Sequence, residues 1–387
     1  MHKTGKYWVF ALYILVVVFF CCPDYSIDAP YCTVIEDSDG ELLGARIASD
    51  GQWRFPQKAT FPETYIQALI TFEDKRFYSH QGIDPIAVLR ALAHNIRQGK
   101  TVEGGSTISM QAVRLMRKGK KRTLKEKIIE TLLAVRLEAS MSKTEILSLY
   151  AANAPFGGNV VGIEAAAWRY FGRNAADLSW AEAATLAVLP NSPALIHPGR
   201  NRNALKIKRD ALLDKMMQKG IVSEDDCMLA KIEPLPENPL PLPRSAPHLL
   251  DKIAEKFPGQ RIATTISSPL QQSVNVVAGN HVNTFKANMV NNAAVIIAEV
   301  ESGDVIAYLG NVLAGNDRHG ANVDIIAAPR STGSILKPFL YAAMLDEGEI
   351  LPGALIPDIP FHIAGFSPQN YSKSFDGAVS AHDALTR

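Results

Sequence analysis

The chain has 387 residues, 47% of them hydrophobic, so it is long enough for two or more folded domains and too apolar for a disordered protein. Forty Lys and Arg residues balance 39 Asp and Glu residues to a net charge of +1, which excludes the overall basic character of a nucleic-acid-binding protein. The cysteines at positions 21, 22, 32 and 227 lack the spacing of a metal or redox site and are too few for a disulfide scaffold.

The N-terminus carries an apolar run from Tyr7 to Cys22. As a helix rising about 1.5 Å per residue, this run would be roughly 24 Å long, slightly short of the ~30 Å hydrocarbon core of a bilayer. Bulky residues such as Phe20 stand where a cleavage site needs small ones, so we predict an uncleaved anchor in residues 1–24 rather than a cleaved signal. Lys3 and Lys6 would stay in the cytoplasm, which places the remaining chain across the membrane.

A short hairpin and a long helical block follow. Residues 33–43 predict the hairpin, with Asp39-Gly40 as its turn. From Pro62 to Lys231 helix signals dominate, so we predict a mainly α domain in residues 25–232. The capping signals are Asp84 before Pro85, Ser142 with Glu145, Ser179 with Glu182, and the helix-ending Gly172 and Gly220. Apolar side chains recur at helical intervals at Leu124, Ile128, Leu132 and Val135.

A proline-rich stretch separates this block from a β-rich one. The prolines at positions 234, 236, 239, 241, 243 and 247 predict a stiff, extended linker, which we assign to residues 233–259. Beyond it, residues 293–300 and 304–309 flank Glu301-Ser302-Gly303 and predict a second hairpin. A second domain is therefore expected in residues 260–387.

Residues with chemical potential gather in the α block. Glu73 and Asp74 adjoin at the end of an apolar helical run, where loss of hydration makes a carboxylate a stronger base. The basic residues that follow are Arg114, Arg117, Lys118, Lys120, Lys121, Arg122, Lys125 and Lys127. Such a run is often a solvated face or a contact for anionic headgroups, yet arginines aimed at one point would stabilise a departing diphosphate.

The order of these motifs resembles a known family. Glu73 to Gly82 and Gly104 to Gln111 are similar to the first two motifs of the family-51 peptidoglycan glycosyltransferase domain of class A penicillin-binding proteins. The run from Arg114 follows them, and the third motif ends in Glu130, with Lys127 three residues before it. Residues 149–172 and 186–193 resemble the fourth and fifth motifs. Met110-Gln111 and residues 154–159 look most like the 1C branch. The resemblance covers roughly residues 40–231 and implies a lysozyme-like, mainly α glycosyltransferase domain.

The resemblance also implies roles for single residues. Glu73 would be the base that deprotonates the acceptor sugar, Glu130 the second essential glutamate, and Arg114 and Arg122 would hold the diphosphate. His80 is expected to give structural support. The implied substrate-binding set is Asp74, Phe77, His80, Gly105, Ser106, Thr107, Gln111, Arg114, Arg122, Lys127 and Asn153. The chain departs from the family at Glu126, where the usual pattern has an arginine before the lysine.

The implied activity is polymerisation of lipid II into glycan strands with release of undecaprenyl diphosphate. The expected partners are lipid II, the growing strand, the cytoplasmic membrane and other wall-synthesis proteins, with no nucleic acid. The expected location is the inner membrane, single-pass, with the domains in the periplasm. No dedicated metal ligands are visible, although assistance from a divalent cation such as Mg²⁺ stays open. The alternatives are a lysozyme-like hydrolase and a catalytically inactive membrane partner.

The second domain contains Ser334 and Lys337 in a Ser-x-x-Lys pattern. Their context resembles an α/β penicillin-binding transpeptidase, with Ser334 as the implied catalytic nucleophile and Lys337 as its activator. The partner motifs Ser-x-Asn and Lys-Thr-Gly do not follow Ser334 in the sequence. We therefore predict an incomplete transpeptidase domain without efficient acylation, either from a shortened gene or as a fragment, and a second chain completing it is the alternative.

Overall fold

The computed structural model describes residues 27, 29–56, 61–98, 105–117, 123–191, 199, 201–313 and 319–386. The chain divides into two compact units, Met1–Ile326 and Ala327–Arg387. The predicted anchor in residues 7–22 and Arg122 lie outside the described residues. Within the described ranges, no helix combines the length and the apolar character that a membrane span requires.

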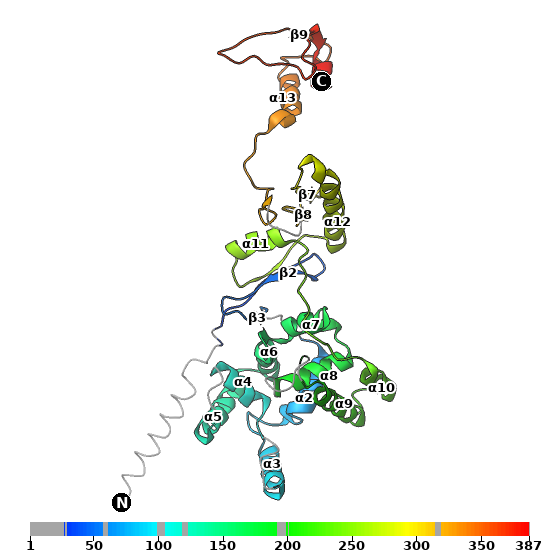
Figure 1. Cartoon of the computed structure of the whole chain (residues 1–387). Coiled ribbons are helices and arrows are strands. Elements are labelled where there is room, and N and C mark those ends of the chain that lie inside the picture. The colour runs from blue at the N-terminus through cyan, green and yellow to red at the C-terminus, as the bar shows by residue number, and fades with distance from the viewer. Residues whose placement is uncertain are drawn as a thin grey trace, which may run out of the picture. The chain divides into compact units, whose positions relative to one another are not determined.

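The predicted mainly α block is confirmed (Figure 1). Its α-helices are α2 (Glu63–Glu73), α3 (Pro85–Gln98), α4 (Ile108–Met116), α5 (Leu124–Ser140), α6 (Lys143–Asn153), α7 (Ile163–Phe171), α8 (Trp180–Val188), α9 (Arg202–Gln218) and α10 (Glu224–Ile232). Short 3₁₀ turns lie at Phe77–Ser79, Ala175–Asp177 and Leu189–Asn191. The α8 helix is buried along nearly its whole length, which is typical of a helix at the centre of a domain.

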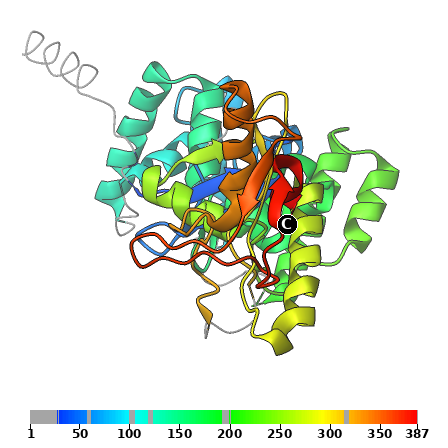
Figure 2. The ribbon, with the colours of Figure 1, turned by 90° about the horizontal axis from the view of Figure 1, so that it is seen from above.

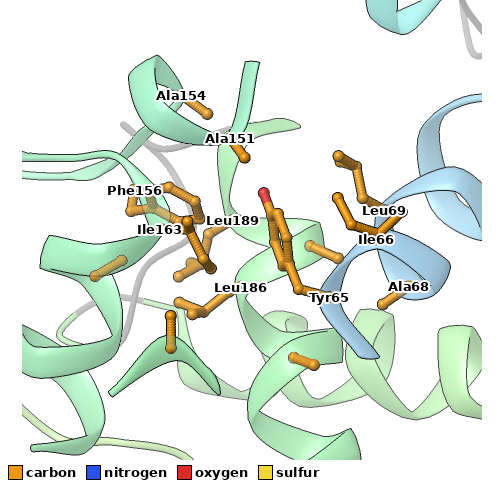
Figure 3. Close-up of a cluster of buried hydrophobic side chains, with 14 of the residues drawn as sticks. Tyr65, Ile66, Ala68, Leu69, Ala151, Ala154, Phe156, Ile163, Leu186 and Leu189 are labelled. Atoms are coloured by element: carbon orange, nitrogen blue, oxygen red, sulfur yellow. The ribbon is translucent and has the colours of Figure 1, made fainter. Parts of the chain in front are cut away.

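The core of the block forms where α2 packs against α8. Tyr65 on α2 lies among Leu69, Leu186 and Phe156, and its hydroxyl is directed toward Ala151 on α6 (Figure 3). The Tyr65 and Phe156 ring centroids are 6.4 Å apart in a tilted arrangement. Aromatic and aliphatic side chains from distant parts of the sequence therefore close one continuous core around the helix that ends in Glu73.

The predicted helix boundaries follow local capping chemistry. Asp84 Oδ1 accepts from the Ala87 amide at 2.8 Å, and both serine capping boxes form. Gly172 and Gly220 end their helices at φ 69° and 70°, a region that glycine enters without a Cβ penalty. The periodic residues of α5 are helical as predicted, but Leu124, Ile128 and Leu132 are exposed and do not face the core.

Small sheets accompany the helices. The predicted first hairpin is confirmed as β1 (Thr33–Glu36) and β2 (Leu42–Arg46), paired antiparallel. The strand β6 (Arg261–Ala263) adds parallel to β1, giving the order β2-β1-β6. A second sheet has the order β3-β5-β4, with strands Trp53–Arg54, Val160–Val161 and Pro155–Gly157. Segments on both sides of the proline-rich stretch thus share one sheet.

The proline-rich stretch is extended from Glu233 to Ala246 and is held by arginines of α9. Arg202 donates to the Leu235 and Pro236 carbonyls at 3.0 and 2.7 Å. Arg209, fully buried, donates to the carbonyls of Lys231 and Glu233. The helix α11 (Pro247–Lys256) occupies part of the range expected as linker, so the extended region is shorter than predicted.

The second hairpin is confirmed as β7 (Val295–Ala298) and β8 (Val305–Leu309), with the long helix α12 (Ser268–Phe285) packed on β8 (Figures 1 and 2). The unit from Ala327 onward contains a 3₁₀ turn (Gly333–Leu336), α13 (Lys337–Asp346), the antiparallel pair β9 (Leu355–Asp358) and β10 (Gly377–Ser380), and α14 (Ala381–Thr386). Among its described residues only Ala381 is buried.

Candidate active site

The site begins at Glu73, the last residue of α2, whose side chain is half-buried. Gln111 Nε2, from α4, donates to Glu73 Oε2 at 2.6 Å. These residues stand 38 positions apart in the sequence. The fold thus brings the predicted base of the first motif against the predicted glutamine of the second. A donor on the carboxylate favours its ionised form, the form that a general base needs.

Tyr150 on α6 extends this contact. Its hydroxyl donates to Gln111 Oε1 at 3.3 Å, and the side chain is buried. Burial raises the pKa of Tyr150 well above its ordinary value, and the neighbouring Glu73 charge raises it further. The sequence places Tyr150 in the segment that resembles the fourth motif, but Tyr150 was not among the predicted site residues. The available signal was an aromatic side chain directly before the small and polar residues Ala151, Ala152 and Asn153.

Asp74 lies next to Glu73 but points into a separate network. Its buried carboxylate accepts from the Ile108 amide at 3.1 Å and contacts His80 Nε2 at 3.0 Å. Ile108 is the first residue of α4, so the Asp74 charge sits at the positive end of that helix. Asp74 therefore links His80 to the first turn of α4, and the structural role of His80 stays a prediction.

Thr107 also joins the first turn of α4 to the first motif, and we call this contact region the junction. It caps α4 by accepting from the Met110 amide at 3.2 Å and donates to the Gly82 carbonyl at 2.7 Å. A Cβ on Gly82 would lie 2.6 Å from the Ala134 backbone, and one on Gly105 would lie 2.9 Å from Val88 Cα. Both glycines thus permit close backbone approaches. Ser106, half-buried, lies between Gly105 and Thr107 in the same turn.

Phe77 completes the support beneath the first motif. Its ring is fully buried, and Lys143 Nζ lies 4.3 Å from the ring centroid. The same ammonium group donates to the His80 carbonyl at 2.6 Å and binds Glu138 at 2.7 Å. Phe77 is therefore a packing residue of the junction in this structure.

Arg114 and Glu130 form a two-point ion pair between α4 and α5. Arg114 Nε and Nη2 donate to Glu130 Oε1 and Oε2 at 2.8 and 2.7 Å. Glu130 is buried, and this pair raises the pKa of the Arg114 guanidinium, so it stays charged. The charge of Glu73 acts on the pKa of Arg114 in the same direction, with a smaller effect.

A second ion pair explains the departure from the family pattern at Glu126. Arg117 Nε donates to Glu126 Oε1 at 2.5 Å, and both side chains are largely shielded from solvent. Near the other end of the two helices, Ser109 donates to Glu138. The α4 and α5 helices lie side by side (Figure 1) and are joined by polar contacts along their length. The charge of Glu126 is therefore directed at Arg117.

The remaining predicted residues are not gathered around Glu73. Lys127 is exposed on α5, and Arg122 lies outside the described residues. Asn153 is buried and donates to the Leu149 carbonyl of its own helix at 2.9 Å. No group of three or more His, Cys, Asp and Glu side chains suited to a metal ion occurs in the described part of the chain.

Ser334 and Lys337 are described within their own unit. Ser334 lies in the 3₁₀ turn before α13, and Lys337 is the first residue of that helix. Both side chains are exposed, and no hydrogen bond joins them among the described residues. The geometry therefore gives no activated hydroxyl at Ser334.

Comparisons with known proteins address the family. A family model described as Transglycosylase matches residues 39–217. Penicillin-binding protein 1C of Escherichia coli is 35% identical over 357 residues, covering 92% of this chain and 46% of that protein. Penicillin-binding protein 1B of Haemophilus influenzae is 30% identical over 386 residues, covering 92% of this chain and 48% of that protein. The chain thus spans about half the length of these relatives.

A crystal structure of penicillin-binding protein 1A from Haemophilus influenzae aligns with 92% of this chain and 59% of that one, at 15% identity and a TM-score of 0.36. A score this low adds nothing to the assignment, which rests on the sequence matches. Those matches show a transglycosylase domain in residues 39–217 and a chain that is similar, along 92% of its length, to class A penicillin-binding proteins such as the 1C protein of Escherichia coli.

Proposed function

We propose that the protein is a peptidoglycan glycosyltransferase that polymerises lipid II into glycan strands. Glu73 removes the proton from the acceptor sugar hydroxyl, and the oxygen attacks C1 of the donor sugar with inversion. Undecaprenyl diphosphate leaves toward Arg114 and Arg122. The observation that carries the proposal is the placement of Glu73 against Gln111, close to the paired Arg114, inside a transglycosylase domain.

Arg114 is suited to the leaving group even though it binds Glu130. A guanidinium has five N–H donors in a fixed plane, and the ion pair uses Nε and one hydrogen of Nη2. The remaining donors face away from Glu130 and match the oxygens of a diphosphate. Glu130 thereby sets the direction of the cation before the substrate binds, which is the preorganisation that stabilises developing charge. Lys127 adds positive charge on the exposed face of α5.

We further propose the inner membrane as the location, with Tyr7–Cys22 as a single-pass anchor and the domains in the periplasm. Large exposed apolar side chains on α3 and α5, among them Leu89, Ile96 and Leu124, would meet lipid or the lipid tail of the substrate. Lys125 and Lys127 beside them would meet anionic headgroups. Other wall-synthesis proteins remain expected partners.

The test is polymerisation of lipid II by the purified full chain in detergent. Wild type should lengthen labelled glycan, and Glu73→Gln should lower the rate by about 10²–10⁴-fold, the usual loss when a general base is removed. Absence of polymer from wild type, or equal polymer from the variant, would reject the proposal. Shortening of added glycan would indicate the lysozyme-like hydrolase, which the basic residues around Arg114 do not favour because a glycan is neutral.

A further inference from the structure

We infer that Tyr150 is a positioning residue for the base: its hydroxyl fixes which end of the Gln111 side-chain amide faces Glu73. The inference rests on the proposed role of Glu73. Three helices contribute one residue each, since Tyr150 lies on α6, Gln111 on α4 and Glu73 on α2. The hydrogen bonds run in one direction, from Tyr150 Oη to Gln111 Oε1 at 3.3 Å and from Gln111 Nε2 to Glu73 Oε2 at 2.6 Å.

The side-chain amide of Gln111 could adopt either of two orientations. A glutamine amide has an acceptor end and a donor end of nearly equal size, so packing alone hardly distinguishes the two orientations. With the NH₂ toward Glu73, the carboxylate receives a hydrogen bond. With the oxygen toward Glu73, two acceptors would face each other at short distance. A donor on the far side of Gln111 selects the first orientation, and Tyr150 supplies it.

Tyr150 can supply that donor throughout the working pH range. A phenol donates only while it keeps its proton, and burial together with the charge of Glu73 raises the pKa of Tyr150 well above its ordinary value. The side chain is buried in the core. Tyr150 therefore acts on Glu73 through hydrogen-bond polarity and does not exchange protons with the substrate.

The other charged groups around Glu73 are directed elsewhere or act in the same sense. Arg114 on α4 is electrostatically coupled to Glu73 and favours its ionised form. Asp74, the next residue, is committed to His80 and the α4 amide. The helices α8 and α9 also pack on α2. Their buried charges are Glu182, which accepts from the Ser179 amide, and Arg209, which donates to the carbonyls near α10.

The chain offers a matched control in Tyr65. This tyrosine is fully buried in the same core, and its hydroxyl is directed toward α6 (Figure 3). Among the described residues its oxygen has no hydrogen-bond partner. Burial raises the pKa of Tyr65, and the charge of Glu73 raises it further. Glu73 has the same effect on the pKa of Tyr150, so both phenols lie within electrostatic reach of the base. Removal of either hydroxyl changes the core by one oxygen atom, but only Tyr150 contacts Gln111.

The experiment compares pH–rate profiles of lipid II polymerisation for full-length wild type, Tyr150→Phe and Tyr65→Phe in detergent. We expect Tyr150→Phe to lower kcat about tenfold and to leave KM within about twofold, because substrate contacts are unchanged. The acid limb of its profile should move to higher pH by about half a unit to one unit, since the carboxylate loses a fixed donor. Tyr65→Phe should keep the wild-type profile.

A second variant tests whether Tyr150 affects kcat only through Gln111. Gln111→Leu removes the amide, so adding Tyr150→Phe to it should cause no further loss of kcat if Tyr150 acts only through Gln111. An unshifted profile in Tyr150→Phe, an equal shift in Tyr65→Phe, or an additive loss in the double variant would overturn the inference. Active wild type with any of these results leaves the proposed function intact. Inactive wild type would instead reject the proposed function itself.

Discussion

Arg114 and Glu130 face each other through two parallel hydrogen bonds that join the last turn of α4 to α5. Two bonds between planar groups fix orientation as well as distance, so the guanidinium keeps one direction. The pair joins a residue three positions after the second motif to Glu130, the last residue of the third motif. The two predicted glutamates therefore differ in their contacts. Glu73 accepts a hydrogen bond from Gln111 and is proposed to take a proton, whereas Glu130 binds the Arg114 guanidinium.

Replacement of Arg114 by lysine tests this geometry. We expect Arg114→Lys to slow polymerisation at least about tenfold although the positive charge is kept, because an ammonium cannot span both oxygens of Glu130 and also present a flat donor edge to a diphosphate. Arg97→Lys, an exposed arginine in the last turn of α3, is the matched control and should keep the wild-type rate. Initial rates with lipid II measure both, and a wild-type rate in Arg114→Lys would contradict the assignment.

Substitution at Gly82 tests the junction of the first motif with α5. Gly82 and Gly40 have nearly equal φ values, 87° and 85°, so alanine is strained at both. Only at Gly82 does the new Cβ also meet backbone, at 2.6 Å from Ala134, whereas nothing lies within 4 Å at Gly40. We expect Gly40→Ala to cost about 1 kcal/mol and Gly82→Ala clearly more. Thermal unfolding midpoints compare them, and equal shifts would contradict the close approach.

The thiol of Cys32 should be unreactive in the folded chain. Burial raises its pKa from 9.0 to about 11, although the Arg54 amide donates to the sulfur at 3.2 Å. Because the folded value is the higher one, this group's contribution to stability is complete below about pH 9 and is lost as the pH rises toward 11. With the other cysteines replaced by serine, a thiol reagent at pH 8 should label the chain only after denaturation. Rapid labelling of the folded chain would refute this expectation.

Ser334 should not form a stable acyl-enzyme in this chain. Its side chain is exposed, and Lys337 makes no hydrogen bond to it among the described residues. We expect little or no covalent labelling by a fluorescent penicillin, since a serine hydroxyl without a hydrogen-bonded base is a weak nucleophile. Stoichiometric labelling that disappears in Ser334→Ala would disprove this.

The local features of this protein could be predicted from its sequence. The serine capping boxes, the Asp84 cap and the Asp39-Gly40 hairpin turn formed as expected because each depends on residues within four positions of one another. The order of motifs identified the transglycosylase family for the same reason, since a motif is a local pattern. Glu73, Gln111, Arg114 and Glu130 could accordingly be singled out from the motifs alone.

Only the tertiary structure decided how these groups pair. The donors on Glu73 and Asp74 come from α4, more than thirty positions away, and sequence spacing cannot assign which carboxylate receives which donor. Sequence spacing also could not assign Glu126 as the partner of Arg117. In the sequence Glu126 reads as a loss of positive charge, whereas in the structure it forms an ion pair. The proline-rich stretch was expected to be stiff, but its attachment depends on carbonyls that accept from Arg202 and Arg209 across the surface of α9. Such contacts depend on the distances between helices that pack around the core with Tyr65, so their partners are a property of the fold and not of the local chain.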